Sequence, residues 1–225
     1  MIPGVRLVIL GKQGAGKGTQ CLRLARHYVV PHISTGDMFR AAVMTGSEFG
    51  RRAEEFMHVG DLIPDEVVIG LVQERLGRDD TVRRGFILDG FPRTVHQAEA
   101  LMSFLSPRGI DLAIDLEVDN EAVLARLAGR RVCQTCGVIY HVTARPKHGW
   151  TCDHCGGEVV QRDDDTETAI RRRLRLYEEQ TAPLISWYES RDQLARLDGM
   201  GALDEVTARF VELIDHRRME RGVHG

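Results

Sequence analysis

The sequence predicts an α/β protein whose parallel sheet is flanked by helices, and three observations support that fold class. Short apolar runs typical of buried strands alternate with helical patterns, as in chains that join parallel strands through crossover helices. A glycine-rich segment separates the first apolar run from the first helical pattern. Between Gly129 and Asp165 the alternation stops, and four cysteines occur with little helical period. We therefore expect one core with inserted subdomains.

The strands come from short apolar runs bounded by turn-forming or polar residues. In chain order they are Val5–Leu10, Phe86–Asp89 and Leu112–Val118, with Leu194–Leu197 as a last edge strand. Phe86–Asp89 ends in an acidic residue, which a buried strand carries at a cost unless the carboxylate is paired or holds a cation. We therefore expect Asp89 to be either functional or part of a structural salt bridge.

The helices come from 3.6-residue patterns, several of them opened by a capping residue. They are expected at about Gly16–Tyr28, Asp37–Thr45, Glu48–His58, Asp65–Leu76, Asn120–Ala128, Thr166–Ser190 and Ala202–Arg218. The expected caps are Thr35, Ser47 and Pro64. Proline inside a helix removes a hydrogen bond and clashes with the preceding turn, so Pro183 should kink or split its helix.

Composition restricts the classes of partner. The chain has 225 residues, 43% hydrophobic and 28% charged, with a net charge of −3. A nucleic-acid-binding domain is usually strongly basic, so no nucleic-acid partner is expected for this chain. There is no apolar stretch long enough for a membrane span and no signal-peptide pattern at the N-terminus, so we expect a cytoplasmic protein without a membrane partner. Any anion site must come from local clusters of positive charge.

The segment Gly11–Thr19 forms a phosphate-loop motif between the first strand and the first helix. Glycines allow backbone N–H groups to surround a polyphosphate at a helix N-terminus, where the helix dipole also favours anions. Lys17 would reach the β- and γ-phosphate oxygens. The usual motif has serine or threonine directly after the lysine, whereas here Gly18 precedes Thr19. A glycine-rich turn with a surface lysine is the alternative.

Five segments in order resemble the adenylate kinase family: Gly16–Gln20, Ser34–Arg40, Gly60–Glu66, Asp89–Thr94 and Gly129–Arg131. The resemblance covers essentially the whole chain, and one departure is Gln13, where the family usually has proline. It implies a P-loop NTPase-like core formed by residues 1–33, 64–128 and 166–225. It also implies an AMP-binding subdomain at residues 34–63 and a zinc-binding lid at residues 129–165.

The same resemblance implies reversible phosphoryl transfer from Mg-ATP to AMP, giving two ADP, by a monomer. The implied ATP-binding residues are Gly14, Ala15, Gly16, Lys17, Gly18, Thr19, Arg126 and Arg130. The implied AMP-binding residues are Thr35, Gly36, Arg40, Met57, Gly90, Arg93, Gln97, Arg162 and Arg173. The implied catalytic residues are Lys17, Asp89, Arg93, Arg126, Arg162 and Arg173.

Within these sets the resemblance assigns some roles. Thr35 and Gln97 would contact the adenine of AMP, Arg40 and Arg93 would hold its α-phosphate, and Asp89 would lie in the water shell of Mg²⁺. Arg126 and Arg130 are four residues apart and would share a face on a continuing helix. Arg173 is chosen from Arg171–Arg173 by its distance from the Thr181–Leu184 segment. In isolation, Arg40 and Arg171–Arg173 are also consistent with solvated helix faces, and Thr35 with a simple cap. Asp164 and Asp165 are expected to be ion partners at the edge of the lid.

The four cysteines of the interrupted segment form two Cys-x-x-Cys pairs, Cys133/Cys136 and Cys152/Cys155, with fifteen residues between them. This spacing is typical of a zinc ribbon. Four protein ligands leave no open coordination position, so the zinc would be structural. Disulfides and free thiols are the alternatives, and His141 or His154 could substitute as a ligand. Cys21, in the first helix, is expected to be a small core residue.

Other functions remain open on the sequence alone. A kinase that uses GTP with AMP, or one that prefers UMP or CMP, would share this chemistry. The donor base is weakly encoded, and the segment Gly199–Gly201 lacks the lysine common in the family. A zinc-ribbon nucleic-acid-binding protein with a nucleotide-gated switch is a rival from another class. The chain has no Ser-His-Asp or paired-carboxylate arrangement, and transfer to an ionised phosphate oxygen needs no general base.

Overall fold

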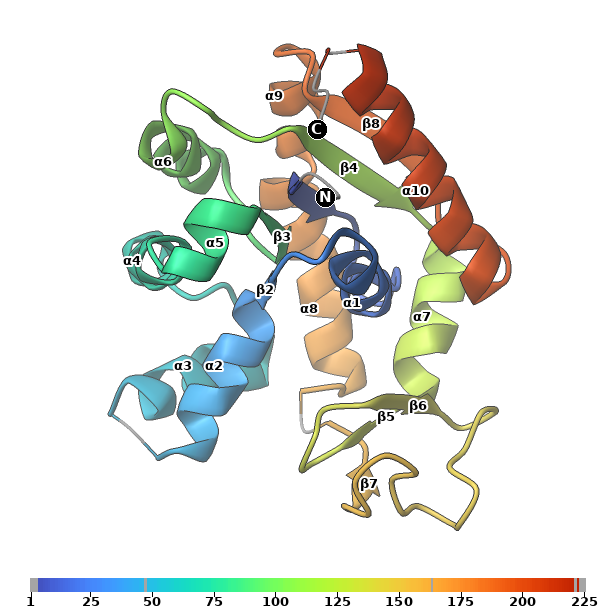
Figure 1. The fold of residues 1–225 in the computed structure, drawn as a ribbon. Coiled ribbons are helices and arrows are strands. Elements are labelled where there is room, and N and C mark those ends of the chain that lie inside the picture. The colour runs from blue at the N-terminus through green and yellow to red at the C-terminus, as the bar shows by residue number, and fades with distance from the viewer. Residues whose placement is uncertain (1–3, 47, 163, 221, 223–225) are drawn as a thin grey trace.

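The computed structural model describes residues 4–46, 48–162, 164–220 and 222 (Figure 1). Its main sheet has five strands in the order β2-β3-β1-β4-β8, and every neighbouring pair is parallel. The strands are β1 (Arg6–Leu10), β2 (His32–Ser34), β3 (Phe86–Asp89), β4 (Leu112–Glu117) and β8 (Leu194–Asp198). The predicted α/β class and parallel sheet are thus confirmed, with β8 at the edge.

Helices cover both faces of this sheet (Figure 1). They are α1 (Lys17–Tyr28), α2 (Thr35–Met44), α3 (Glu48–Val59), α4 (Asp65–Leu76), α5 (Asp79–Arg84), α6 (Val95–Leu105), α7 (Asn120–Gly129), α8 (Glu167–Leu176), α9 (Pro183–Glu189) and α10 (Leu203–Glu220). As predicted, Pro183 divides the long helical segment, because α8 ends before a π-helical turn at Tyr177–Thr181 and Pro183 begins α9.

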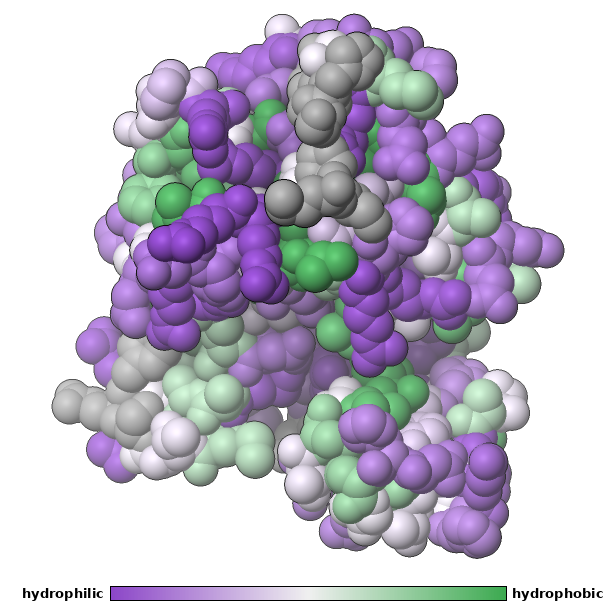
Figure 2. Space-filling model, viewed as in Figure 1, coloured by the Kyte–Doolittle hydropathy of each residue, from purple (hydrophilic) through white to green (hydrophobic). Residues whose placement is uncertain are grey.

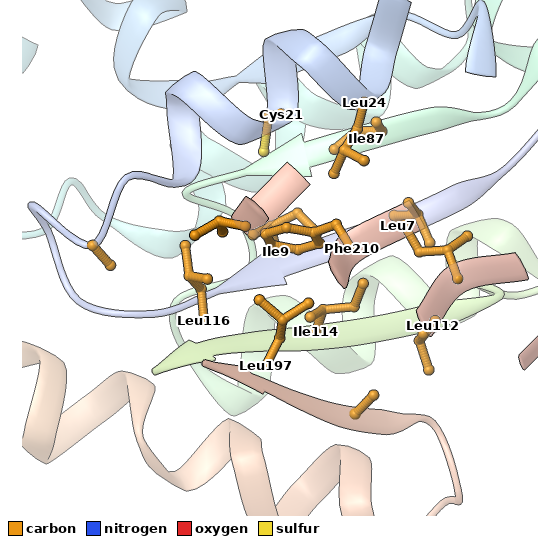
Figure 3. Packing of buried hydrophobic residues seen from close by; sticks show 14 of the residues in the cluster. Leu7, Ile9, Cys21, Leu24, Ile87, Leu112, Ile114, Leu116, Leu197 and Phe210 are labelled. Atoms are coloured by element: carbon orange, nitrogen blue, oxygen red, sulfur yellow. The ribbon is translucent and has the colours of Figure 1, made fainter. Parts of the chain in front are cut away.

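Alternate residues of β1 belong to two hydrophobic cores. Leu7 and Ile9 pack with Leu24 of α1 and Phe210 of α10, as Figure 3 shows. Val8 and its neighbours on the other face pack with α4, α6 and α9. Because side chains alternate between the faces of a strand, a strand buried on both sides is apolar at successive positions. This explains why the unbroken run in the sequence marked a central parallel strand.

Three elements outside the cysteine-containing segment were not predicted from the sequence. Strand β2 has only three residues, and α5 has only six. Helix α6 begins after Thr94, whose hydroxyl accepts a hydrogen bond from the backbone N–H of Gln97 at 3.1 Å. The prediction that Thr35 caps the next helix was wrong, because Ser34 does so by accepting from Asp37 N, and Thr35 is already helical. The predicted cap Ser47 lies outside the described residues.

Two lobes extend from the same side of the main sheet (Figure 1). One is formed by α2 and α3, which pack against each other. The other is a three-stranded antiparallel sheet of β5 (Arg130–Cys133), β6 (Ile139–His141) and β7 (Val159–Val160), with β5 in the centre. Its buried cluster is small, consisting of Cys133, Cys152 and Val159. Among the described residues, no helix is both long and apolar enough to cross a membrane.

Candidate active site

A cleft of about 540 Å³ lies at the carboxyl ends of β1, β2 and β3, between the two lobes. Figure 2 shows the surface hollowed between these lobes, with hydrophilic residues at its depth. In open parallel sheets, ligands bind beyond the carboxyl ends of the strands, where loops present side chains from a rigid frame. Six arginines and Lys17 line the cleft, against four aspartates.

The loop Gly11–Gly16 forms one wall of the cleft and leads directly into α1. Gly14 and Gly16 have φ of 87° and 101°, which other residues adopt only at a cost. A Cβ atom on Gly14 would also lie 2.8 Å from Leu127 Cγ. No side chain caps the start of α1, so its first backbone N–H groups are available to an anion. The geometry fits the predicted phosphate loop.

Lys17 is held at the base of this loop. Its Nζ donates hydrogen bonds to the carbonyl oxygens of Gly11 at 2.7 Å and Lys12 at 2.8 Å. Burial lowers the pKa of Lys17, and the nearby Asp89 carboxylate opposes that shift. The lysine therefore places a largely desolvated positive charge beneath the loop. By contrast, Lys12 points away to Asn120 and Glu178.

Asp89 ends β3 on the floor of the cleft. Its Oδ2 is 3.3 Å from His32 Nε2, which lies on the neighbouring strand β2. Burial alone would raise the pKa of Asp89, but the His32 hydrogen bond and the Lys17 charge lower it overall. A Cβ atom on Gly18 would lie 3.3 Å from Asp89 Oδ2, so the carboxylate directly faces the phosphate loop. Asp89 is therefore an ionised carboxylate inside the cleft.

The opposite wall is built on the loop that follows β3. Arg93 Nε donates to the Gly90 carbonyl at 2.8 Å, and Thr35 Oγ1 donates to the same oxygen at 2.9 Å. Gln97, only 1% exposed, accepts from Arg93 N and donates through Nε2 to Asp65 at 2.7 Å. These bonds fix the Arg93 backbone and bring Thr35 and Gln97 to the same part of the cleft.

Arginines from several elements converge in the cleft and raise its positive potential. The pKa of Arg162 is lowered to about 10, first by burial and then by the charges of Arg40 and Arg130. Burial and the charge of Arg173 lower the pKa of Arg93. Arg162 Nε is buried and has no hydrogen-bond partner. A buried donor without a partner is costly, so this arrangement fits a site that binds an anion.

Two buried ion pairs lie where the second lobe joins the core. Arg130 and Asp165 are bidentate partners, with Arg130 Nε donating to Oδ2 at 2.7 Å. Arg173 Nη2 donates to Asp164 Oδ2 at 2.6 Å and to the Met57 carbonyl at 2.9 Å. The expected ion pairing of Asp164 and Asp165 is thereby confirmed. The prediction that Arg126 and Arg130 share one face of a continuing helix was wrong, because α7 ends at Gly129 and Arg130 begins β5.

The structure brings together nearly all the residues predicted to contact nucleotide. Those that line the cleft are Gly14, Gly16, Lys17, Gly18, Thr19, Thr35, Gly36, Arg40, Met57, Asp89, Gly90, Arg93, Gln97, Arg126, Arg130, Arg162 and Arg173. The exception is Ala15, whose side chain is buried, although its carbonyl accepts from Arg126 Nη1 at 2.9 Å.

Sequence reasoning missed several residues of the cleft. Tyr140 and His141 line it from β6, and Thr181 Oγ1 donates to the Arg93 carbonyl at 3.0 Å. The position of His141 also explains why residue 129 is glycine, because a Cβ atom on Gly129 would lie 1.9 Å from His141 Nε2. No local pattern distinguishes these side chains. The Thr181–Leu184 segment resembles the family, but that resemblance assigns no role to Thr181.

The four cysteines of the second lobe converge as their spacing predicts. Their Sγ atoms all lie within 4.8 Å of one another, with Cys133 to Cys155 at 3.5 Å and Cys136 to Cys152 at 3.6 Å. These separations exceed the roughly 2.05 Å of a disulfide. They are close to the roughly 3.8 Å between sulfurs bound to one tetrahedral zinc ion at about 2.3 Å. The thiols therefore fit a closed four-sulfur metal site.

Comparisons with known proteins agree with this geometry. A family model described as "Adenylate kinase" matches residues 9–193. A curated "Adenylate kinase" of Moorella thermoacetica is 54% identical over 205 residues, covering 90% of this chain and 94% of that protein. One of Acidothermus cellulolyticus is 50% identical over 215 residues, covering 94% and 99%. One of Geobacillus sp. is 48% identical over 214 residues, covering 93% and 98%.

The Arg130–Asp165 pair gives a prediction about stability. The Asp165 side chain is fully buried and that of Arg130 is 13% exposed. Removing one partner of a buried pair leaves an uncompensated charge, so Asp165→Asn should lower the free energy of unfolding by about 3–5 kcal/mol. Denaturant unfolding followed by circular dichroism measures this change.

The matched control is Glu167→Gln, which breaks an exposed ion pair with Arg171 just inside α8. Exposed pairs four residues apart on a helix contribute about 0.3–0.5 kcal/mol. Equal losses of stability in the two variants would contradict a special role for the buried pair.

Proposed function

The chain belongs to the adenylate kinase family, and on that premise we propose that it transfers the terminal phosphoryl group of Mg-ATP to AMP, reversibly, giving two ADP. The observation that carries the proposal is the cleft itself. It joins a phosphate loop on one wall to a cluster of mutually repelling arginines on the other, and Arg162 there retains an unpartnered buried donor. The matches favour neither a GTP-dependent nor a UMP- or CMP-directed kinase.

On the donor side, the proposal assigns the ATP phosphates to the backbone of residues 14–19. Lys17 would exchange its bonds to the Gly11 and Lys12 carbonyls for the β- and γ-phosphate oxygens. Arg126 already donates to the Ala15 carbonyl, which fixes its guanidinium beside the loop. Arg130, held by Asp165, adds a second fixed charge on the lid side of the phosphates.

On the acceptor side, the proposal assigns the α-phosphate of AMP to Arg40 and Arg93 and its adenine to the pocket lined by Thr35 and Gln97. Arg40 is paired with Asp37 and Arg93 with the Gly90 carbonyl, so each must adjust to reach a phosphate. Gly36 and Gly90 leave room for close approach, because a Cβ atom on either would meet an arginine nitrogen at 3.0–3.1 Å.

The chemistry requires positioning and charge neutralisation more than proton transfer. The attacking AMP oxygen is already ionised near neutral pH, so no general base is needed. Arg162 and Arg173, with Lys17, would stabilise the charge that develops on the transferred group. Their donors are fixed before reaction by the ion pair to Asp164 and by burial, so little reorganisation accompanies transfer.

Asp89 fits a role in holding Mg²⁺. It is an ionised carboxylate on the floor of the cleft, and it faces the phosphate loop at Gly18. Mg²⁺ prefers oxygen ligands and retains several waters, so the carboxylate would hold that water shell. When bound with ATP, the ion neutralises phosphate charge.

The second lobe would act as a lid stabilised by zinc. Its buried cluster is too small to fold on hydrophobic burial alone, so a four-thiolate zinc site would supply the folding energy. We further propose that residues 129–165 and 34–63 are units that close over the core formed by 1–33, 64–128 and 166–225. Closure would exclude water that could hydrolyse ATP. The enzyme is proposed to be a cytoplasmic monomer without nucleic-acid or membrane partners.

The donor assignment predicts that Lys17→Met lowers kcat by about 10²–10³-fold, because a fixed charge at the transferred phosphate is lost. Arg93→Ala should have a comparable effect from the acceptor side. A coupled assay of ADP formation measures both.

Lys12→Met is the matched control, since Lys12 occupies the same loop but points to Asn120 and Glu178. Its rate should stay near that of the wild type. A rate near wild type in Lys17→Met and Arg93→Ala as well would refute the assignment.

The lid assignment predicts about one zinc per purified chain, because the lid has one closed four-sulfur site. Replacing Cys133 and Cys136 by serine should remove the metal and lower the melting temperature, whereas Cys21→Ala should retain the zinc. Elemental analysis with calorimetry tests this, and a metal-free wild type with an intact thermal transition would rule it out.

A further inference from the structure

A second cluster of metal-ligating side chains lies away from the lid, beneath the phosphate loop. Cys21 of α1, His32 of β2 and Asp89 of β3 present ligand atoms that all lie within 4.8 Å of one another. Cys21 follows Lys17 by one helical turn, and in Figure 3 its sulfur points from α1 toward the sheet. Cys21 is fully buried, and the side chains of His32 and Asp89 are 10% and 13% exposed.

The geometry is close to that of a tetrahedral zinc site with three protein ligands. Zinc bound at about 2.0–2.3 Å holds its ligand atoms roughly 3.4–3.6 Å apart. His32 Nε2 and Asp89 Oδ2 are already at 3.3 Å. Only the Cys21 sulfur must move closer, by no more than about 1.2–1.4 Å on the same geometry, which a side-chain rotation and a small shift of α1 can supply. Cys21 is a buried core residue, as expected, but its sulfur also lies close to the ligand atoms of His32 and Asp89.

The donor set selects the kind of ion. A thiolate, an imidazole and a carboxylate suit Zn²⁺ or Cd²⁺, whereas Mg²⁺ prefers oxygen ligands alone. Thiolate and carboxylate together carry two negative charges, which a divalent ion neutralises. The nearby Lys17 charge, which also faces Asp89, opposes binding of any cation, so an ion that binds here must gain enough from the thiolate to offset that repulsion.

Three protein ligands leave the fourth position of a tetrahedral ion open. Asp89 lines the cleft and faces Gly18 of the phosphate loop, so this open position would be directed at the place where the donor phosphates bind. Zinc bound directly to Asp89 would compete with the water shell of Mg²⁺ for this carboxylate.

We propose that Cys21, His32 and Asp89 form a second metal site, for Zn²⁺ or a similarly thiophilic divalent ion, whose occupation blocks the productive Mg-ATP complex. On binding, the thiol loses its proton to solvent and the sulfur becomes a ligand, with no change of oxidation state. Metal binding stands on the geometry alone. The inhibition rests on the proposed role of Asp89 in phosphoryl transfer.

The test is a zinc titration of purified protein whose lid metal is retained. Wild type should bind one additional equivalent by calorimetry and lose most of its phosphoryl-transfer rate, and raising Mg²⁺ should restore the rate. Cys21→Ala removes a ligand, so affinity for the additional zinc should fall by at least about 100-fold. Its rate without added zinc should stay near that of the wild type.

His32→Gln is the second variant, because glutamine can still donate a hydrogen bond to Asp89 but is a poor zinc ligand. It keeps the test decisive if Cys21→Ala proves unstable. Equal zinc binding by wild type and both variants would overturn the site. An additional zinc that binds through Cys21 and His32 without slowing the reaction would overturn the competition with Mg-ATP and leave the site standing. Absence of phosphoryl transfer before zinc is added would instead refute the proposed function.

Discussion

Positive charge held partly out of water is the constraint on which the rest of this structure depends. Lys17, Arg93 and Arg162 all have lowered pKa values, with burial as the main cause, and the charges of neighbouring arginines add to all three shifts. Such a cluster is costly without an anion. The ionised Asp89 offsets part of the charge, and Asp164 and Asp165 neutralise Arg173 and Arg130. The remaining charge is what a polyphosphate would satisfy.

The fold places these charges by simple means. Parallel strands end at one edge of the sheet, so the loop after β1 and the carboxylate that ends β3 necessarily lie side by side. The two lobes rise from that edge and bring further arginines to it from outside the sheet. Asp89 stands where these requirements meet. It faces the phosphate loop, and with Cys21 and His32 it also completes the second set of metal ligands.

Local patterns in the sequence predicted the central strands, most helices, the phosphate loop and the four-cysteine cluster, because each depends on residues close together in the chain. Strand β2 and helix α5 were missed because three and six residues carry too little periodicity. Tyr140, His141 and the His32–Asp89 contact could not be predicted, since they arise from the packing of distant segments. The arginines were assigned only through family resemblance. The number of arginines in the sequence does not indicate which of them converge in the cleft.

The most direct test of the central claim is the crystal structure of the protein with a two-headed adenosine polyphosphate, which mimics donor and acceptor joined by their phosphates. The account predicts that the phosphate chain lies against the backbone N–H groups of residues 14–19. It also predicts that Arg162 Nε gains the partner it lacks and that Arg40 and Arg93 contact the phosphate nearer the second adenosine. A cleft left empty under saturating ligand, or a ligand bound elsewhere, would contradict it.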